Sequence, residues 1–169
     1  MRILGIDPGY AIVGYGIVDT NGYNFSVVGY GAITTSANLP FSQRLKYIYD
    51  DMLTVIDKYH PEELSIERLY FNTNTTTAID VAQARGVIIL AAQSKGVRIN
   101  EYTPLQVKQA VTGYGKAEKR QVMEMIKSLL KLKAVPKPDD TADALALALC
   151  HGHFAGSSVS KIIRGEQNK

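Results

Sequence analysis

The sequence RILGIDPG, residues 2–9, contains an apolar run that stops at Asp7, Pro8 and Gly9. A short apolar run bounded by proline and glycine is typical of a strand buried on both faces of a sheet. Asp7 would then stand at the carboxyl end of that strand, where α/β sheets bind their ligands. Asp-Pro-Gly also forms turns well by itself, so Asp7 is either a turn residue or a ligand, and this stretch alone favours neither.

The composition indicates one ordinary globular domain. The chain has 169 residues, of which 46% are hydrophobic and 21% charged, so it is long enough to bury a core. The formal net charge of +3 is only mildly basic. Clusters of basic residues therefore matter more than the total charge when nucleic acid is considered.

Cys150 is the only cysteine, which excludes an internal disulfide and a cysteine-based zinc site and fits a reducing compartment. The sequence starts without the cationic and apolar pattern of a signal peptide, and it contains no run of about eighteen apolar residues. We therefore expect a cytoplasmic protein that does not enter the membrane.

The pattern along the chain predicts strands and helices of one α/β domain over residues 1–154, followed by a flexible polar tail over residues 155–169. Asn21-Gly22 between two β-rich stretches predicts a hairpin, and the connection from the first to the fourth strand is long enough to be parallel. The predicted strands cover residues 2–7, 11–18, 23–35, 64–67 and 97–102. The predicted helices cover residues 39–59, 75–95, 103–112, 117–132 and 139–154.

Acidic residues stand at the ends of two predicted strands and at the start of the last helix. If the first and fourth strands are neighbours, their carboxyl ends bring Asp7 and Glu67 together. Asp140 and Asp143 project from one helical face, and Asp139 pairs with Asp143 nearly as well. Either Asp139 or Asp140 should cap the helix, and the spacing leaves open which one does.

Four carboxylates in one cleft repel each other unless cations compensate their charge. Ligand sets made only of oxygen favour Mg²⁺ or Mn²⁺ over zinc or copper. A pair of such ions activates water and stabilises the leaving oxygen in phosphoryl displacement. Phosphodiester hydrolysis is therefore the chemistry that these residues favour.

Taken together, five motifs in this order and spacing resemble the RuvC-type Holliday-junction resolvases of the RNase H-like superfamily. The motifs are ILGIDPG at 3–9, IERLYF at 66–71, QARG at 83–86, QVKQAVTGYGKAEKRQV at 106–122 and DDTADALALA at 139–148. In this resemblance the four metal-binding acids of the family fall on Asp7, Glu67, Asp140 and Asp143. Asp139 is then left as the helix cap.

The resemblance implies an RNase H-like fold, with a mixed five-stranded sheet flanked by helices, and a homodimer that works with the RuvA-RuvB branch-migration complex. It implies symmetric nicks in two opposite strands of a four-way DNA junction, with 5′-phosphate and 3′-hydroxyl ends. Two Mg²⁺ ions per active site, replaceable by Mn²⁺, are expected. A twofold dimer suits such a substrate, and the small-residue helix 75–95 would form its interface unless it only packs on its own sheet.

Basic residues are concentrated in the stretch 106–131. Lys108 and Lys119 match basic residues of the family's active site, where they would neutralise the scissile phosphate. A second expectation concerns one helical face, which would contact the DNA backbone or merely be solvated; its members are Lys116, Arg120, Lys127 and Lys131. We expect DNA contact for Lys116, Lys119 and Arg120 above all.

The stretch after Glu67 supplies the remaining candidate DNA contacts, Tyr70, Phe71 and Asn74. By resemblance, Tyr70 is the aromatic that stacks on bases near the junction centre. For Phe71 the alternative is a core position, and the polar loop 72–77 either reaches base edges or caps the next helix. The histidines lie away from the acidic motifs and receive no catalytic role.

Three other functions fit parts of the pattern. An RNase H-like nuclease could act on another substrate such as structured RNA, because fold and acids do not determine specificity. An actin-like ATPase also begins with a sequence like LGIDPG, but it needs a second lobe for which this chain is too short. A non-catalytic junction-binding module would not need acids at all four positions.

Overall fold

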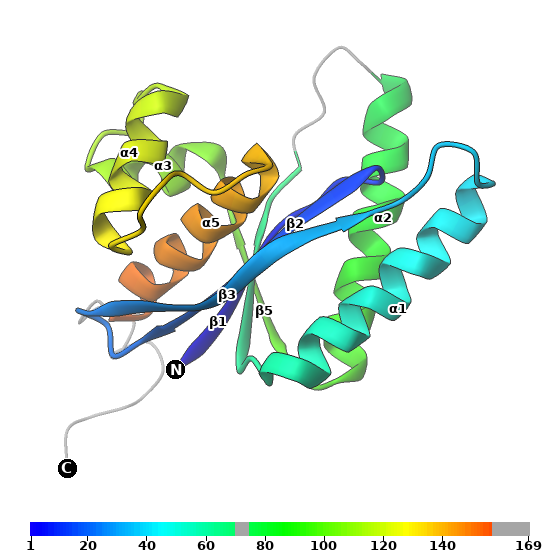
Figure 1. The fold of residues 1–169 in the computed structure, drawn as a ribbon, viewed down its shortest axis with the longest axis horizontal. Helices are drawn as coiled ribbons and strands as arrows, with labels where there is room; N and C mark the ends of the chain where they lie inside the picture. The colour runs from blue at the N-terminus through cyan, green and yellow to red at the C-terminus, as the bar shows by residue number, and fades with distance from the viewer. Residues whose placement is uncertain (70–74, 157–169) are drawn as a thin grey trace.

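A mixed five-stranded sheet forms the centre of the protein, with strand order β3-β2-β1-β4-β5 (Figure 1). The computed structural model describes residues 1–69 and 75–156. β1 pairs antiparallel with β2 and parallel with β4, β2 pairs antiparallel with β3, and β4 pairs parallel with β5. The strands are β1 (Arg2–Asp7), β2 (Ile12–Thr20), β3 (Phe25–Thr34), β4 (Glu63–Glu67) and β5 (Arg98–Tyr102). The helices are α1 (Phe41–Tyr59), α2 (Thr75–Ser94), α3 (Pro104–Thr112), α4 (Lys119–Leu129) and α5 (Asp139–Gly156).

The predicted fold class is confirmed, and most predicted bounds lie within two residues of the observed ones. The local signals explain this agreement. At the start of α3, the backbone N–H of Gln106 donates to the Thr103 hydroxyl at 3.1 Å, and the N–H of Thr103 donates to the Gln106 side chain at 2.9 Å. This reciprocal capping box satisfies two N–H groups that a helix leaves free.

Two helical layers cover the sheet. Helices α1 and α2 lie on one face, and α3, α4 and α5 lie on the other (Figure 1). Alternate strand residues point to each layer: Leu4 and Ile6 of β1 are buried beneath α1 and α2, whereas Ile3 packs with α5. Each large aliphatic side chain that is buried in this way contributes about 1.5–3 kcal/mol.

Helix α5 packs against both the sheet and the smaller helices, and it contacts β1, β2, α3 and α4. Two buried polar contacts attach it to β4. The Ser65 hydroxyl donates to the Leu147 carbonyl at 2.7 Å, and Nε2 of His151 lies 2.7 Å from Glu63 Oε2. Cys150 is fully buried on the same helix, and burial raises the pKa of its thiol to about 12, so it behaves as a small apolar residue.

None of the helices within residues 1–69 and 75–156 combines the length and the hydropathy that a membrane span requires. The longest helix, α2, instead buries Ala84, Ile88, Ala91 and Ala92.

Candidate active site

Acidic residues at the carboxyl ends of two neighbouring parallel strands lie side by side. Asp7 is the last residue of β1 and Glu67 the last residue of β4. Ile6 pairs with Ile66 in the parallel register, so the two acids that follow emerge side by side. The sequence-based expectation that the crossover is parallel is therefore confirmed.

Helix α5 begins above this edge and brings Asp143 into the same cleft as Asp7 and Glu67. The cleft has a volume of about 280 Å³. It is lined by Asp7, Glu67, Pro104, Val107, Lys108, Lys119, Val122, Asp143, Ala146 and Leu147. Asp140, one turn before Asp143, is close enough for its charge to act on Asp7.

The carboxylates of the cleft repel each other in a partly buried environment. The pKa of Asp7 is raised to about 7, first by burial and then by the charges of Asp143, Asp140 and Glu67, against the opposing charge of Lys119. Burial and the charge of Asp143 also raise the pKa of Glu67. Burial raises the pKa of Asp143 as well, although Lys119 opposes the shift. The cleft therefore carries more negative charge than its own cations neutralise.

Lys119 provides the main positive charge at this edge. Its Nζ donates to Asp143 Oδ2 at 3.1 Å and lies 3.6 Å from Asp139 Oδ2. Burial lowers the pKa of Lys119, but the hydrogen bond and charge of Asp143 outweigh that effect and raise it overall.

Asp139 differs from the other acids in being exposed and already paired. Its carboxylate accepts from Lys137 Nζ at 2.6 Å, and this hydrogen bond lowers its pKa. Asp139 is the first residue of α5, where a negative charge stabilises the helix N-terminus. Asp139 therefore lies within the helix and not at the cap position before it, so the prediction that it is the helix cap is wrong, and its carboxylate binds Lys137.

The donor set of the cleft fits a hard divalent cation. Carboxylate oxygens are the ligands that Mg²⁺ and Mn²⁺ prefer, and the repulsion among Asp7, Glu67 and Asp143 is what such a cation relieves. Within the described parts of the chain, no three acidic, histidine or cysteine side chains already converge as a ready metal-binding group. Asp143 accepts a hydrogen bond from Lys119, so a cation bound by Asp143 would share this carboxylate with the lysine.

The basic residues divide into two groups. Lys108 and Lys119 line the cleft, as expected from their match to active-site residues. Lys116 and Arg120 are exposed outside it.

The predicted stripe of four basic residues along one helix is wrong. Helix α4 spans only Lys119–Leu129, so Lys116 precedes it and Lys131 follows it with a positive φ of 52°. The helix starts later than predicted because the Gln121 side chain accepts a hydrogen bond from the backbone N–H of Glu118 at 2.8 Å. This capping contact makes Glu118 the residue before the helix. Only Arg120 and Lys127 of the four lie on α4.

The expected aromatic and loop contacts, Tyr70, Phe71 and Asn74, lie outside the described residues. Their roles remain predictions.

The end of β4, just before these residues, is held by Arg85, a residue to which the sequence-based predictions gave no role. Arg85 of α2 donates from Nε to the Glu67 carbonyl oxygen at 3.0 Å and from Nη2 to Glu101 Oε2 at 2.8 Å. Arg85 belongs to the QARG motif at residues 83–86, and this motif was the feature of the sequence that could have indicated its role.

His151 and His60 both lie outside the acidic cleft. His151 is buried between Glu63 and the Tyr102 hydroxyl, at 2.7 Å from each. His60 lies at the other end of the sheet, just after α1.

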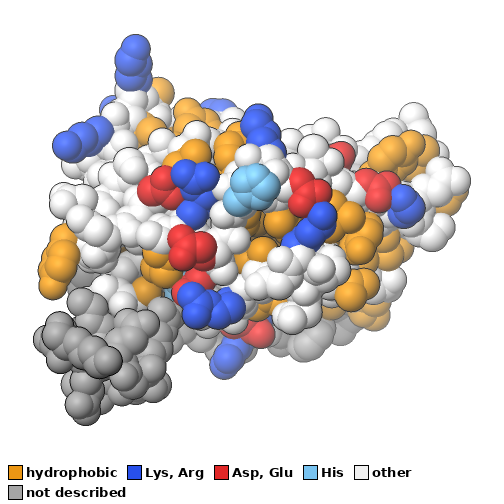
Figure 2. All heavy atoms as spheres, turned by 90° about the horizontal axis from the view of Figure 1, so that it is seen from below, with side chains coloured by type: hydrophobic (Ala, Val, Ile, Leu, Met, Phe, Trp, Pro, Cys, Tyr) orange, Lys and Arg blue, Asp and Glu red, His pale blue; other side chains and the backbone are white. Residues whose placement is uncertain are grey.

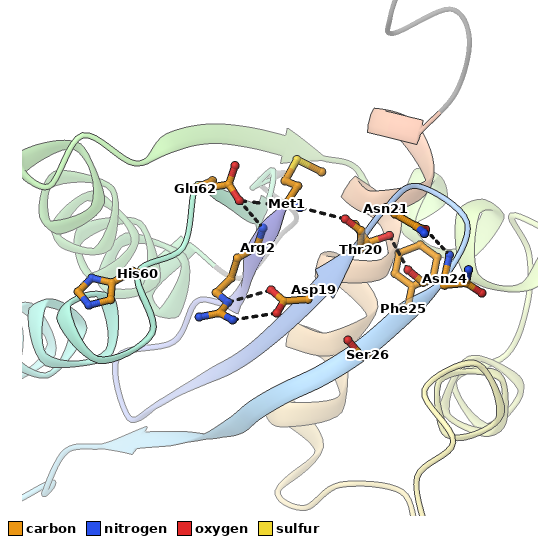
Figure 3. Close-up of a pocket in the computed structure, with 10 residues that line it drawn as sticks. All are labelled: Met1, Arg2, Asp19, Thr20, Asn21, Asn24, Phe25, Ser26, His60 and Glu62. Atoms are coloured by element: carbon orange, nitrogen blue, oxygen red, sulfur yellow. Dashed lines mark hydrogen bonds and ion pairs between the residues drawn. The ribbon is translucent and has the colours of Figure 1, made fainter.

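A second and larger hollow, of about 570 Å³, lies at that opposite end, where β1 begins (Figure 3). Its charged groups pair with each other: the Arg2 guanidinium donates to both carboxylate oxygens of Asp19 at 2.8 Å, and the Arg2 N–H donates to Glu62. Figure 2, which views the molecule from below, shows basic and acidic side chains interspersed on this side. The hollow therefore lacks the unbalanced charge of the acidic cleft.

Comparison with known proteins shows the family of the chain. Residues 3–151 match the family model described as crossover junction endodeoxyribonuclease RuvC. A crossover junction endodeoxyribonuclease RuvC from Brevibacillus brevis is 60% identical over 154 residues, which cover 91% of this chain and 93% of that protein.

Solved structures give the same result. Thermus thermophilus RuvC in complex with Holliday junction substrate is 35% identical, with a TM-score of 0.88 over 92% of this chain and 95% of that one. The yeast mitochondrial Holliday junction resolvase Ydc2 shares the fold, with a TM-score of 0.65 at 14% identity over 97% of this chain and 83% of that one. The chain belongs to the RuvC family of crossover junction endodeoxyribonucleases.

Proposed function

We propose that this protein resolves four-way DNA junctions by hydrolysing one phosphodiester bond in each of two opposite strands. The observation that carries the proposal is the cleft in which Asp7, Glu67 and Asp143 lie together with Lys108 and Lys119. Acids and lysines in one cleft suit a phosphodiester substrate, because the lysines would attract the phosphate and a metal held by the acids would activate the water that attacks it. The products are nicks with 5′-phosphate and 3′-hydroxyl ends.

The cofactor is Mg²⁺, with Mn²⁺ as a substitute, and two ions serve each site. Asp7, Glu67, Asp140 and Asp143 would hold them. When bound, the metal supplies an activated water and stabilises the leaving oxygen. Lys119, which donates to Asp143, would contact the scissile phosphate where a cation held by Asp143 neutralises that carboxylate.

DNA binding involves the cleft and its surroundings. Lys116 and Arg120 are exposed and can reach phosphates without disturbing an ion pair within the cleft. Tyr70, Phe71 and Asn74 come three to seven residues after Glu67 in the sequence, and we propose that they contact bases next to the scissile bond. Tyr70 is the candidate for stacking.

We further propose that the working form is a homodimer built through α2. One side of this helix packs on the sheet through Ala84, Ile88 and Ala91, whereas Ile79 and Leu90 are 56% and 59% exposed on the other. A twofold dimer supplies two active sites of opposite orientation for two strands of a junction. The RuvA-RuvB complex is the proposed partner, and the cytoplasm the proposed location.

A cleavage assay tests the proposal. A four-way junction, a linear duplex of the same sequence and an RNA–DNA hybrid are incubated with the protein in Mg²⁺ or in EDTA. We expect paired nicks in the junction, in Mg²⁺ only, that a ligase can seal. Preferential cleavage of the hybrid would instead support the alternative of an RNase H-like enzyme with an RNA substrate.

A further inference from the structure

Helix α5 lies unusually close to the sheet at its catalytic end, and glycines make this possible. Gly14 of β2 is the direct cross-strand partner of Asp7. A Cβ atom added at Gly14 would overlap the backbone carbonyl of Asp140 and lie 2.9 Å from the N–H nitrogen of Thr141. These atoms belong to the first turn of α5, so they cannot yield as the end of a flexible side chain would.

Gly5 repeats this arrangement one step further along the sheet. It lies two residues before Asp7 on β1, and so on the same face. A Cβ atom at Gly5 would overlap the Ala144 carbonyl oxygen and lie 2.7 Å from the backbone nitrogen of Ala148. Both glycines therefore face the backbone of α5 and neither faces a side chain.

Polar contacts attach the middle and the later part of α5 to β4. Ser65 pairs with Gly5 across β1 and β4, and its hydroxyl binds the Leu147 carbonyl. One turn later, His151 contacts Glu63 of the same strand. Glycines thus set how closely the helix approaches the sheet, while Ser65 and Glu63 set its position along β4.

We propose that Gly14 and Gly5 are positioning residues for the metal site. Asp7 and Glu67 are carried by the sheet, and Asp140 and Asp143 by α5, so the separation of the two pairs depends on how closely the helix approaches. A methyl group at Gly14 acts on the peptide of Asp140 itself and would move both helical acids away from Asp7. The inference rests on the proposed function, because it assumes that these four acids share a metal.

The test compares two sheet glycines. Gly14→Ala is matched with Gly29→Ala on β3, where the added Cβ atom would meet the Tyr59 hydroxyl at 2.7 Å, far from the acids and at the end of a side chain that can move. For each variant we would measure the rise in Tm on adding Mn²⁺, the Mn²⁺ concentration for half-maximal junction cleavage, and junction affinity in EDTA. The first measurement needs neither DNA nor catalysis.

We expect Gly14→Ala to raise the Mn²⁺ requirement at least about tenfold and to lose most of the metal-induced rise in Tm, as changes in residues that support metal ligands do. Its junction affinity should stay within about threefold of the native value, since metal-free binding depends on the basic surface. Gly29→Ala should lose stability without a change in metal requirement. A folded Gly14→Ala protein with native metal dependence overturns the proposal.

Gly16→Ala provides a gentler test should Gly14→Ala fail to fold. A Cβ atom there would lie 2.7 Å from the Leu145 side chain and 3.2 Å from its Cα atom, so part of the overlap can relax. We expect a shift of about threefold in Mn²⁺ requirement, in the same direction as for Gly14→Ala. A native Mn²⁺ requirement in folded Gly16→Ala contradicts the inference. If the native protein shows a metal-induced rise in Tm but no junction cleavage, the proposed function fails and the positioning role still stands.

Discussion

The two ends of the central sheet contain hollows that differ in how their charges are balanced. At the end where β1 begins, Arg2 pairs with Asp19, which lowers the pKa of Asp19 and raises that of Arg2. At the other end, Asp7 and Glu67 have raised pKa values because burial and neighbouring acids oppose their ionisation. The first hollow is the larger one. Unbalanced charge, more than volume, therefore distinguishes the site at which a cation and a phosphate would bind.

Exchanging one carboxylate at each end gives the largest expected contrast. Asp7→Asn should lower the rate of Mg²⁺-dependent junction cleavage by at least about 1,000-fold, because it removes a metal ligand from the centre of the acidic group. Junction affinity, measured by gel shift in EDTA, should change by less than about threefold. Asp19→Asn is the control and should cleave normally. Near-native cleavage by Asp7→Asn would refute the assignment of the site.

The pH dependence of stability should also differ between the ends. An acid whose pKa is raised by folding costs stability once the pH exceeds its unfolded value of 3.8, and the cost is complete above the folded value of about 7. The metal-free protein should therefore lose roughly 2–4 kcal/mol relative to Asp7→Asn between pH 4 and pH 8.

Urea unfolding of both proteins at the two pH values measures this difference. Mg²⁺ added at pH 8 should restore stability to the native protein and have little effect on Asp7→Asn. If the free energy of unfolding varies with pH in the same way for both proteins, ionisation of Asp7 does not lower the stability of the folded state.

Lys119 and Lys137 offer a comparison within the catalytic end. Both contact Asp139, but only Lys119 also contacts Asp143 and lines the cleft. Lys119→Met should lower junction cleavage by about 10- to 100-fold, because the phosphate loses a cation that stabilises its developing charge. Single-turnover rates on a junction at saturating Mg²⁺ measure the effect. Lys137→Met should cleave within about twofold of the native rate. An equal loss of cleavage in both variants would show that Lys119 acts through its ion pair with Asp139 and not on the phosphate.

The smallest effect is expected from the paired end. Asp19→Asn removes the bidentate partner of Arg2, and both side chains are partly exposed. The free energy of unfolding at pH 7 should fall by about 0.5–1 kcal/mol, as for other exposed ion pairs. Because the pKa of Asp19 is lowered by folding, this difference should vanish as the pH falls below the folded pKa. Thermal melts at pH 7 and at a series of lower pH values follow the difference, and a loss that does not shrink as the pH falls would point to packing instead of charge.

The sequence by itself predicted the elements and the acids that we propose as metal ligands. Buried apolar runs, the Asn21-Gly22 turn and the Thr103 capping box act locally, so their strands and helices could be predicted within a few residues. The placement of Asp7 and Glu67 at strand ends followed from the same patterns. The start of helix α4 was predicted two residues too early because the capping contact of Gln121 was not recognised.

Only the tertiary structure decided how these residues act on each other. Glycines beneath α5 are invisible to a periodicity argument, since their importance lies in the backbone of a helix more than a hundred residues away. The raised pKa of Asp7 likewise results from burial and from three acids on two other segments, β4 and α5. Local patterns depend on neighbours in the chain, whereas the charge and geometry of the cleft depend on neighbours in space, and those are set only when the helix meets the sheet.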